Sequence, residues 1–234
     1  MPSVANRLIE GLPRDARSRL LAMCEPVELS LAQVLYDGDA RPRHVYFPTG
    51  STLSLWTSPR DLPVMEVAMV GSEGMLGSHI ALGVSTAATF AQVQEAGLAL
   101  RMPVARFKTE LLSSAALQRS IHRYLHVTIL QGVSMARCSR FHSLNQRLAR
   151  WLLMTHDRAH KDTLRVTQEL MGSMLGVRRV GITTAAVALQ RRAVIDYARG
   201  EITILDRKAL EAAACSCYAA DGRSYSKFLS KPAR

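Results

Sequence analysis

The sequence lacks the features that mark membrane-spanning proteins and disulfide-rich secreted proteins. No apolar run approaches the roughly 18 residues that a bilayer-spanning helix requires, and residues 1–15 contain no apolar signal-peptide core. Cysteine is rare, with four in 234 residues, which is too few and too scattered for a disulfide framework. We therefore expect a cytoplasmic protein with reduced thiols and no membrane partner.

Acidic residues are also scarce: 19 Asp and Glu stand against 30 Lys and Arg, a net charge of +11. The excess is concentrated in residues 141–234, which hold 16 basic and 8 acidic side chains, whereas residues 1–140 hold 14 and 11. A basic half of this kind indicates a polyanionic partner, because each phosphate contacted releases counterions. A membrane surface fits less well, since no strongly basic amphipathic helix with bulky aromatic residues is present.

Residues 166–191 contain the pattern of two short helices joined by a glycine turn. Thr167 can cap the first helix, and Gly176 can end it, because glycine tolerates the left-handed backbone of a sharp turn. Gly172 is expected where the two helices approach closely. The second helix, from about residue 178 to residue 191, has an inward apolar face formed by Ile182, Ala185, Ala186 and Leu189.

Two β-rich runs follow the second helix and surround Arg199-Gly200. They predict a hairpin, which is the wing of a winged helix-turn-helix. Before the two helices, Ser143 can cap a further helix over about residues 144–157, and residues 158–165 are expected to form a polar loop. A unit of this type lays its second helix in the major groove of DNA. The alternative interpretation is plain core packing without DNA contact.

The motif LGVRR…ALQRRAVIDYARGEITILDRKALEAAAC, over residues 175–215, resembles the C-terminal domain of the Crp/Fnr family of bacterial transcription regulators. The resemblance extends more weakly over the N-terminal half. It implies an α+β protein with a jelly-roll-like β-roll, a long dimerisation helix and a winged helix-turn-helix. It also implies double-stranded DNA, a second copy of the chain and RNA polymerase as partners.

The sequence itself supports this division. A helical lead, residues 6–24, is expected to break at Pro13. Many short strand patterns separated by Gly and Pro turns follow, as is typical of a jelly roll. The expected domains are the β-roll with its lead (1–114), the dimerisation helix (115–140), the winged helix-turn-helix (141–217) and a poorly ordered basic tail (218–234).

The long helix over residues 115–140 shows the 4,3 spacing of a coiled-coil seam. Its alternative role is an ordinary core helix packed against the β-roll. The length and the resemblance favour a two-fold dimer helix, because two helix-turn-helix units read a pseudo-palindrome. The expected dimer interface consists of Leu117, Ile121, Tyr124, Thr128, Gln131 and Met135.

The second helix of the motif begins with two arginines, and arginine can bind guanine through two hydrogen bonds. Arg179 matches the base-reading arginine of the resembled family. Val180 replaces a glutamate and Thr184 replaces an arginine that are common there, so a different operator sequence is expected. The candidate base-reading residues are Arg179, Val180, Thr183 and Thr184. The candidate phosphate contacts are Thr167, Arg178, Arg191, Arg192 and Arg199.

A glycine-rich stretch over residues 71–77 corresponds to the cyclic-nucleotide site of some resembled proteins. The candidate effector residues are Gly71, Glu73, Gly74 and Gly77, and the alternative is that the glycines form turns of the roll. No Lys or Arg occurs in residues 78–94, and a buried phosphate without a cation is costly. We therefore expect control by a signal other than cyclic AMP, or DNA binding that needs no effector.

No metal or iron–sulfur cluster is expected. The N-terminal half contains a single cysteine, Cys24, which is too few for the cluster of some resembled proteins. Several short His and Cys spacings lack an obvious third and fourth ligand. They are His122/His126, His156/His160 and Cys215/Cys217. A cupin-like enzyme shares the jelly-roll architecture, but no His-x-His occurs in the sequence, so an enzyme is not expected.

Overall fold

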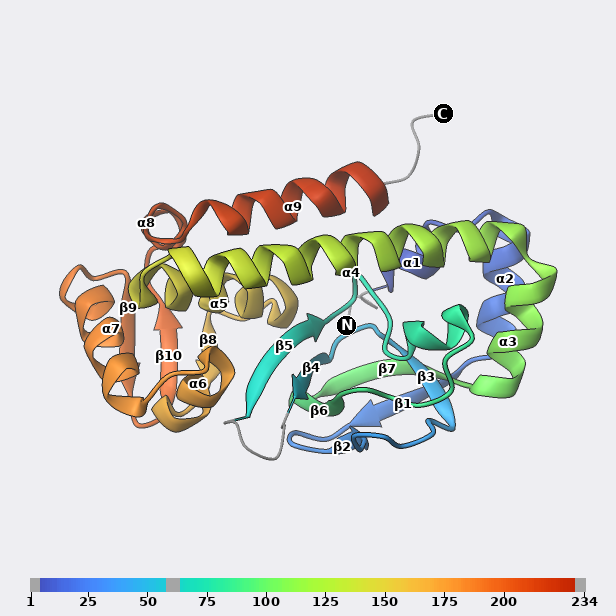
Figure 1. Cartoon of the computed structure of the whole chain (residues 1–234), viewed down its shortest axis with the longest axis horizontal. Coiled ribbons are helices and arrows are strands. Elements are labelled where there is room, and N and C mark those ends of the chain that lie inside the picture. The colour runs from blue at the N-terminus through green and yellow to red at the C-terminus, as the bar shows by residue number, and fades with distance from the viewer. Residues whose placement is uncertain (1–4, 58–63, 230–234) are drawn as a thin grey trace. The chain divides into compact units, whose positions relative to one another are not determined.

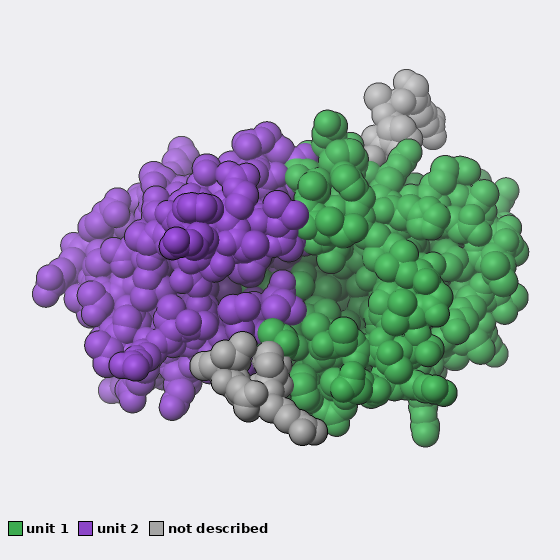
Figure 2. All heavy atoms as spheres, viewed as in Figure 1, with its two compact units in different colours: residues 1–57, 68–130, 224–234 green, residues 58–67, 131–223 purple. Residues whose placement is uncertain are grey.

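The computed structural model describes residues 5–57 and 64–229, and it has the predicted α+β architecture (Figure 1). Two compact units contain these residues, as Figure 2 shows by colour. Unit 1 comprises the described parts of residues 1–57, 68–130 and 224–234, and unit 2 the described parts of residues 58–67 and 131–223. Along the chain, the strands of the predicted β-roll come first and the helix-turn-helix comes later.

Unit 1 begins with the predicted helical lead. Helix α1 (Arg7–Glu10) is capped by Asn6, whose side-chain oxygen accepts hydrogen bonds from the next turn. Helix α2 (Arg14–Ala22) starts directly after Pro13, so the break falls where the sequence predicted it. The Asn6 amide also donates to the carbonyl oxygens of Pro48 and Gly74, at 2.9 and 2.8 Å, which fastens the lead to the β-roll.

Two antiparallel sheets and a short 3-10 helix, η1 (Ser78–Leu82), form the β-roll. The three-stranded sheet contains, in order, β1 (Glu25–Leu29), β7 (Gly97–Pro103) and β3 (His44–Pro48). The four-stranded sheet contains, in order, β2 (Val34–Tyr36), β6 (Phe90–Glu95), β4 (Thr52–Thr57) and β5 (Met65–Val70). The register pairs Val45 with Met102, and both side chains are fully buried.

Helices α3 (Val104–Ser113) and α4 (Ala115–Phe141) follow the roll. A core cluster of unit 1 unites apolar residues from the lead, the three-stranded sheet, α3 and α4. Its largest fully buried side chains include Phe47 and Phe107. The first half of α4 is therefore part of the hydrophobic core of this unit.

This packing corrects the predicted dimer interface. Leu117, Ile121 and Tyr124 are 2%, 0% and 4% exposed, and they belong to the chain's own core cluster. The 4,3 spacing of these three residues thus describes a helix packed on its β-roll, which was the alternative interpretation. The exposed large apolar side chains of α4 are instead Ile129 and Val133 along the helix, at 65% and 53%, and Phe141 at its last residue, at 77%.

Unit 2 contains the helices and strands of the winged helix-turn-helix, with a three-stranded antiparallel sheet in the order β8-β10-β9. Strand β8 lies within the predicted polar loop 158–165, so that prediction was wrong at its end, where Thr163–Arg165 pair with β10. The elements in chain order are α5 (Leu144–Ala159), β8 (Thr163–Arg165), α6 (Gln168–Leu175), α7 (Arg179–Arg191), β9 (Ile195–Ala198), β10 (Glu201–Ile204) and α8 (Arg207–Ala213).

The last described element is helix α9 (Ser216–Leu229), which occupies most of the predicted disordered tail. The prediction of a poorly ordered tail is wrong over these residues, and residues 230–234 lie outside the described part of the chain. The reason is specific side-chain contact. Asp221 is buried and forms an ion pair of 2.7 Å with the buried Arg150 of α5. A basic composition alone did not reveal that partner.

Among the described residues, no helix is long and apolar enough to cross a membrane.

Gly172 lies where α6 and α7 approach each other, and Gly222 on α9 provides a control without close neighbours. A methyl group at Gly172 would meet the backbone oxygen of Val177 at 2.9 Å, whereas one at Gly222 on α9 would meet nothing within 4 Å. We expect Gly172→Ala to lower the free energy of unfolding by about 1–3 kcal/mol, as overpacking does. Gly222→Ala should raise it by up to about 1 kcal/mol through helix propensity. Urea denaturation measures both, and a Gly172→Ala protein as stable as Gly222→Ala would contradict the close approach.

Candidate nucleic-acid interface

Helices α6 and α7 form the helix-turn-helix with the predicted cap and turn. The Thr167 hydroxyl oxygen accepts a hydrogen bond from the backbone N–H of Leu170 at 3.1 Å. Gly176 ends α6 in the left-handed region, with φ of 62°, and its N–H bonds to carbonyls of the last turn. Both local predictions are confirmed, because cap and turn chemistry depends on neighbours in sequence.

The inward face of α7 is also the predicted one. Ile182, Ala185, Ala186 and Leu189 are each at most 2% exposed. The opposite face is therefore open to solvent, and Val180 is 75% exposed on it.

Arginines stand at the start of α7. Arg178 occupies the cap position and Arg179 is the first helical residue, and both are exposed. Their positive charges lie at the helix N-terminus, where the backbone N–H groups also favour an anion. The start of α7 can therefore attract phosphate and still extend a guanidinium toward a base.

The two threonines of the candidate reading face differ in their surroundings. Thr183 is partly buried, and its hydroxyl donates to the side-chain oxygen of Gln168 at 2.6 Å. Thr184 is exposed, and its hydroxyl donates back to the carbonyl of Val180 at 3.1 Å. Thr183 thus connects α7 to the first turn of α6, while Thr184 presents its methyl group and hydroxyl at the surface.

The wing lies beside the start of α6. Arg199 and Gly200 both have positive φ, 51° and 81°, as in the two-residue turn that suits a hairpin. The Gly200 carbonyl accepts a hydrogen bond from the N–H of Val166 at 2.9 Å, one residue before Thr167. The structure therefore brings together two of the candidate phosphate contacts, Thr167 and Arg199. Arg191 and Arg192 are exposed at the far end of α7.

Helix α5 supports this surface from behind. Ser143 and Gln146 form a reciprocal capping box at its start. The Arg147 guanidinium donates to the backbone oxygen of Leu175, the last residue of α6. This contact satisfies a carbonyl at the end of α6 and connects the turn of the helix-turn-helix to α5.

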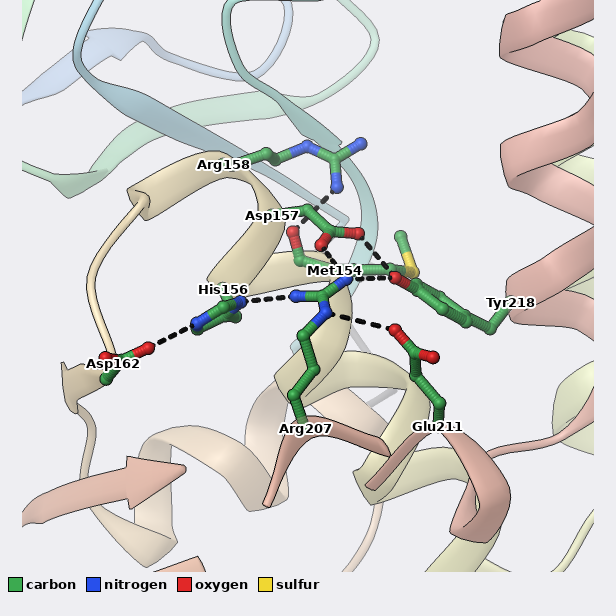
Figure 3. A network of polar contacts seen from close by, with 8 residues as sticks. All are labelled: Met154, His156, Asp157, Arg158, Asp162, Arg207, Glu211 and Tyr218. Atoms are coloured by element: carbon green, nitrogen blue, oxygen red, sulfur yellow. Dashed lines mark hydrogen bonds and ion pairs between the residues drawn. The ribbon is translucent and has the colours of Figure 1, made fainter. Parts of the chain in front are cut away.

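A polar network centred on Arg207 connects α5, α8 and the start of α9 (Figure 3). Arg207 forms an ion pair of 2.6 Å with Asp157 and one of 3.0 Å with Glu211. It also donates to the Tyr218 hydroxyl at 2.8 Å, and this hydroxyl donates to Asp157 at 2.9 Å. Burial, reinforced by the neighbouring Asp157 carboxylate, raises the pKa of Tyr218 to about 12.

The same network reaches the loop before β8. Arg207 also contacts Nδ1 of His156, and Nε2 of His156 lies 2.9 Å from a carboxylate oxygen of Asp162 (Figure 3). Because a guanidinium can only donate, Nδ1 is the acceptor and Nε2 is assigned the hydrogen that bonds to Asp162. Arg207 thereby connects the end of α5 to α8 and α9, and His156 extends the network to the loop before β8.

The candidate effector residues in unit 1 already pack against, or hydrogen-bond to, neighbouring residues of the same chain. Gly74 lies against Tyr124 of α4, so closely that a methyl group there would overlap the phenol. Glu73 is 9% exposed and accepts a hydrogen bond from the N–H of Gly71 at 3.2 Å. Gly77 has φ of 93°, which a turn requires. These contacts favour the interpretation of the glycines as turns of the roll.

A cavity of about 200 Å³ lies elsewhere in unit 1. None of the four candidate effector residues lines it, and its lining includes Arg7 of α1 and Arg119 and Arg123 of α4.

Sequence reasoning did not find one cluster of side chains in unit 2. Cys138, His142, Cys215 and Cys217 offer three sulfur atoms and one imidazole nitrogen within 4.8 Å of one another. The signal was hidden because the four residues come from two segments about 75 residues apart, and only their pairwise spacings were visible in sequence. The fourth cysteine, Cys24, lies in unit 1, where burial raises the pKa of its thiol to about 12.

Comparison with protein families finds one model, described as a Crp-like helix-turn-helix domain, that matches residues 146–213. The match covers α5 to α8, which are the elements that carry the surface described above. The comparison with curated protein sequences gave no significant match.

Solved structures with the same fold include several bacterial regulators. FixK2 from Bradyrhizobium japonicum is 12% identical, with a TM-score of 0.69 over 82% of this chain and 98% of that chain. The c-di-GMP-responsive global regulator CLP from Xanthomonas campestris is 13% identical, with a TM-score of 0.67 over 82% and 99%.

TTHA1359, a Crp/Fnr-family transcriptional regulator from Thermus thermophilus, is 19% identical, with a TM-score of 0.65 over 81% of this chain and 98% of that chain. At these identities, the similarity to solved structures concerns the fold. The matched domain model adds a Crp-like helix-turn-helix over residues 146–213.

The Arg207 network gives a prediction about stability. We expect Arg207→Met to lower the free energy of unfolding by about 1–2 kcal/mol, because it removes hydrogen bonds to Asp157 and Tyr218. Lys208→Met changes the same charge at the exposed neighbouring position and should stay within about 0.5 kcal/mol of the wild type. Thermal unfolding followed by circular dichroism measures both variants. Equal stability of the two would show that the network contributes nothing.

Proposed function

We propose that this chain, a Crp/Fnr-type transcription regulator by its Crp-like helix-turn-helix domain and its fold, binds a pseudo-palindromic DNA operator as a homodimer. The observation that carries the proposal is the outer surface of α7, where exposed Arg178, Arg179 and Val180 begin a helix whose opposite face is buried. A helix held in this way can enter the major groove, which is about 12 Å wide.

Arg179 is the main base-reading residue of the proposal. It follows the cap residue of α7, and in this position a guanidinium can reach O6 and N7 of guanine. Val180 and Thr184 supply apolar contact, for which the methyl group of thymine is the natural target. Thr183 has a supporting role, because its hydroxyl is already bonded to Gln168.

Phosphate contacts flank the reading helix in this proposal. Arg199 in the wing turn and the exposed N-terminus of α6 at Thr167 are close together, and they fit one DNA strand. Arg191 and Arg192 lie at the C-terminal end of α7. At 1.5 Å per helical residue, Arg191 is about 18 Å along the helix from Arg179. Arg178 completes the set. These contacts would fix the register of the protein on DNA without reading sequence.

Dimerisation is assigned to the exposed side of α4. Ile129 and Val133 are one helical turn apart, and Gly132 and Ala136 beside them are small enough for a partner helix to approach. Of the six residues predicted from sequence, Thr128, Gln131 and Met135 are half-buried and can take part at the edge of this surface. Contact with RNA polymerase is proposed from the resemblance to the family.

The controlling signal is proposed to be a ligand or event other than cyclic AMP. The absence of Lys and Arg from residues 78–94 and the packing of Tyr124 against Gly74 both disfavour an anionic nucleotide at the glycine-rich stretch. An alternative is constitutive DNA binding. Unchanged operator affinity in the presence of millimolar cyclic AMP is expected in both cases.

A paired substitution tests the two kinds of DNA contact. On an operator selected from random duplexes, Arg179→Ala should weaken binding by about 1–3 kcal/mol per site and relax discrimination at one base pair. Arg199→Ala should weaken all duplexes alike and reduce the slope of log K against log salt by about 1 per protomer. Fluorescence anisotropy at several salt concentrations measures both.

Each variant of this pair is the control for the other. If Arg179→Ala lost affinity equally on every sequence, its base-reading role would be wrong. If no duplex were bound in preference to any other by the wild type, the proposed function itself would fail.

A second experiment concerns the dimer. Ile129→Glu should weaken dimerisation at least about tenfold, because burial of an isoleucine contributes roughly 1.5–3 kcal/mol and each tenfold change corresponds to about 1.4 kcal/mol. Leu112→Glu is the matched control, since Leu112 on α3 is 83% exposed. Sedimentation equilibrium gives the dissociation constants. A dimer unaffected by Ile129→Glu would rule out this face of α4.

A further inference from the structure

Four potential metal ligands meet where α4 ends and α9 begins. Cys138 and His142 belong to the last turn of α4 and the residue just after it, and Cys215 and Cys217 flank the first residue of α9. The three cysteines are at most 4% exposed and form a small cluster of their own. All four residues belong to unit 2.

The distances between the ligand atoms fit a single tetrahedral ion. The Sγ atoms of Cys138 and Cys215 are 3.5 Å apart, and Sγ of Cys217 is 3.7 Å from Nδ1 of His142. All four atoms lie within 4.8 Å of one another. Zn–S bonds of about 2.3 Å and Zn–N bonds of about 2.0 Å in a tetrahedron require ligand separations of roughly 3.5–3.8 Å. Only small side-chain adjustments would complete the site.

The surroundings offer a buried hydrogen-bond donor to the thiolates of such a site. Three thiolates and Zn²⁺ carry a net charge of −1, which is costly to bury alone. Arg150, 4% exposed, forms an ion pair with Asp221, and its Nε has no hydrogen-bond partner within the described part of the chain. Arg150 lies close enough to Cys138 and Cys215 for its charge to act on both sulfur atoms. A buried guanidinium with a donor to spare is suited to a thiolate.

We propose that Cys138, His142, Cys215 and Cys217 bind one structural Zn²⁺ ion. Three thiol protons leave to solvent when the ion binds, and the neutral imidazole donates its Nδ1 lone pair. The proposal replaces the expectation of unliganded thiols, because Cys138 of α4 and His142 just after it offer the third and fourth ligands that the Cys215/Cys217 pair lacked in sequence. The close spacing favours one ion over an iron–sulfur cluster, which holds its ligands further apart around several irons and sulfides.

The position of the site suggests what the ion does. The matched helix-turn-helix domain spans residues 146–213, and the ligands lie immediately outside both of its ends. The ion would therefore join the two chain segments that enter and leave the domain, closing the loop between Cys138 and Cys215, which are 77 positions apart. Such a closure stabilises the folded unit against its unfolded chain, as binding energy at a structural zinc site becomes folding energy.

The test is metal analysis of the full-length protein purified under reducing conditions without a metal-affinity step. We expect about one zinc per chain, with neither iron nor acid-labile sulfide. A thiol reagent added to native protein should modify three more cysteines after the metal has been removed with a chelator than before. Cobalt reconstitution of chelated protein should give the visible absorption of a tetrahedral thiolate complex. Stoichiometric iron and sulfide, or four unliganded thiols in metal-free protein that takes up no cobalt, would overturn the proposal.

Substitutions at the proposed ligands and at Cys24 show whether zinc binding depends on these ligands or on any cysteine of the protein. Cys217→Ser and His142→Ala should each lower zinc affinity at least about tenfold, whereas Cys24→Ser in unit 1 should keep one zinc per chain. If the ligand variants do not fold, the cobalt and thiol measurements on the wild type still decide the matter. A disulfide between Cys138 and Cys215, detected as two missing thiols in the fresh denatured protein, would also contradict a zinc site. None of these measurements uses DNA, so their failure would leave the proposed function standing.

Discussion

The close approach of α6 and α7 is the constraint on which the DNA-binding unit depends. Gly172 leaves no room for a side chain, and Ala185 and Ala186 keep the buried face of α7 small. A reading helix must be held rigidly, because hydrogen bonds to base edges tolerate little displacement. Two side-chain contacts add to this rigidity: Thr183 of α7 bonds to Gln168 at the start of α6, and Arg147 of α5 bonds to Leu175 at its end.

Local chemistry explains why so much of this unit could be predicted from sequence. The Thr167 cap, the Gly176 turn and the buried face of α7 each depend on residues a few positions apart, and each was predicted correctly. The predicted dimer interface failed at Leu117, Ile121 and Tyr124 for the opposite reason. A 4,3 pattern states that one face of a helix is apolar, but it does not say whether that face meets another chain or the chain's own sheet.

Contacts between distant segments account for the other failures. Helix α9 was mistaken for a disordered tail because its composition is basic, whereas its order comes from single polar residues. Tyr218 joins the Arg207 network, and Asp221 pairs with Arg150, 71 residues earlier. The Cys138, His142, Cys215 and Cys217 cluster was missed in the same way. Periodicity and motif spacing carry no information on such partners, which only the tertiary structure brings together.

The ion pair of Arg150 with Asp221 has a consequence for how the protein is made. Arg150 lies in the middle of α5, the first helix of the DNA-binding unit, and a buried charge left without its partner costs about 3–5 kcal/mol. Its partner is synthesised 71 residues later. On the ribosome, the complete set of helix-turn-helix residues emerges before the carboxylate that neutralises its interior. The ion pair that joins α5 to α9 can therefore form only after residue 221 has left the exit tunnel, so the C-terminal helix is the last part to be fastened to the domain.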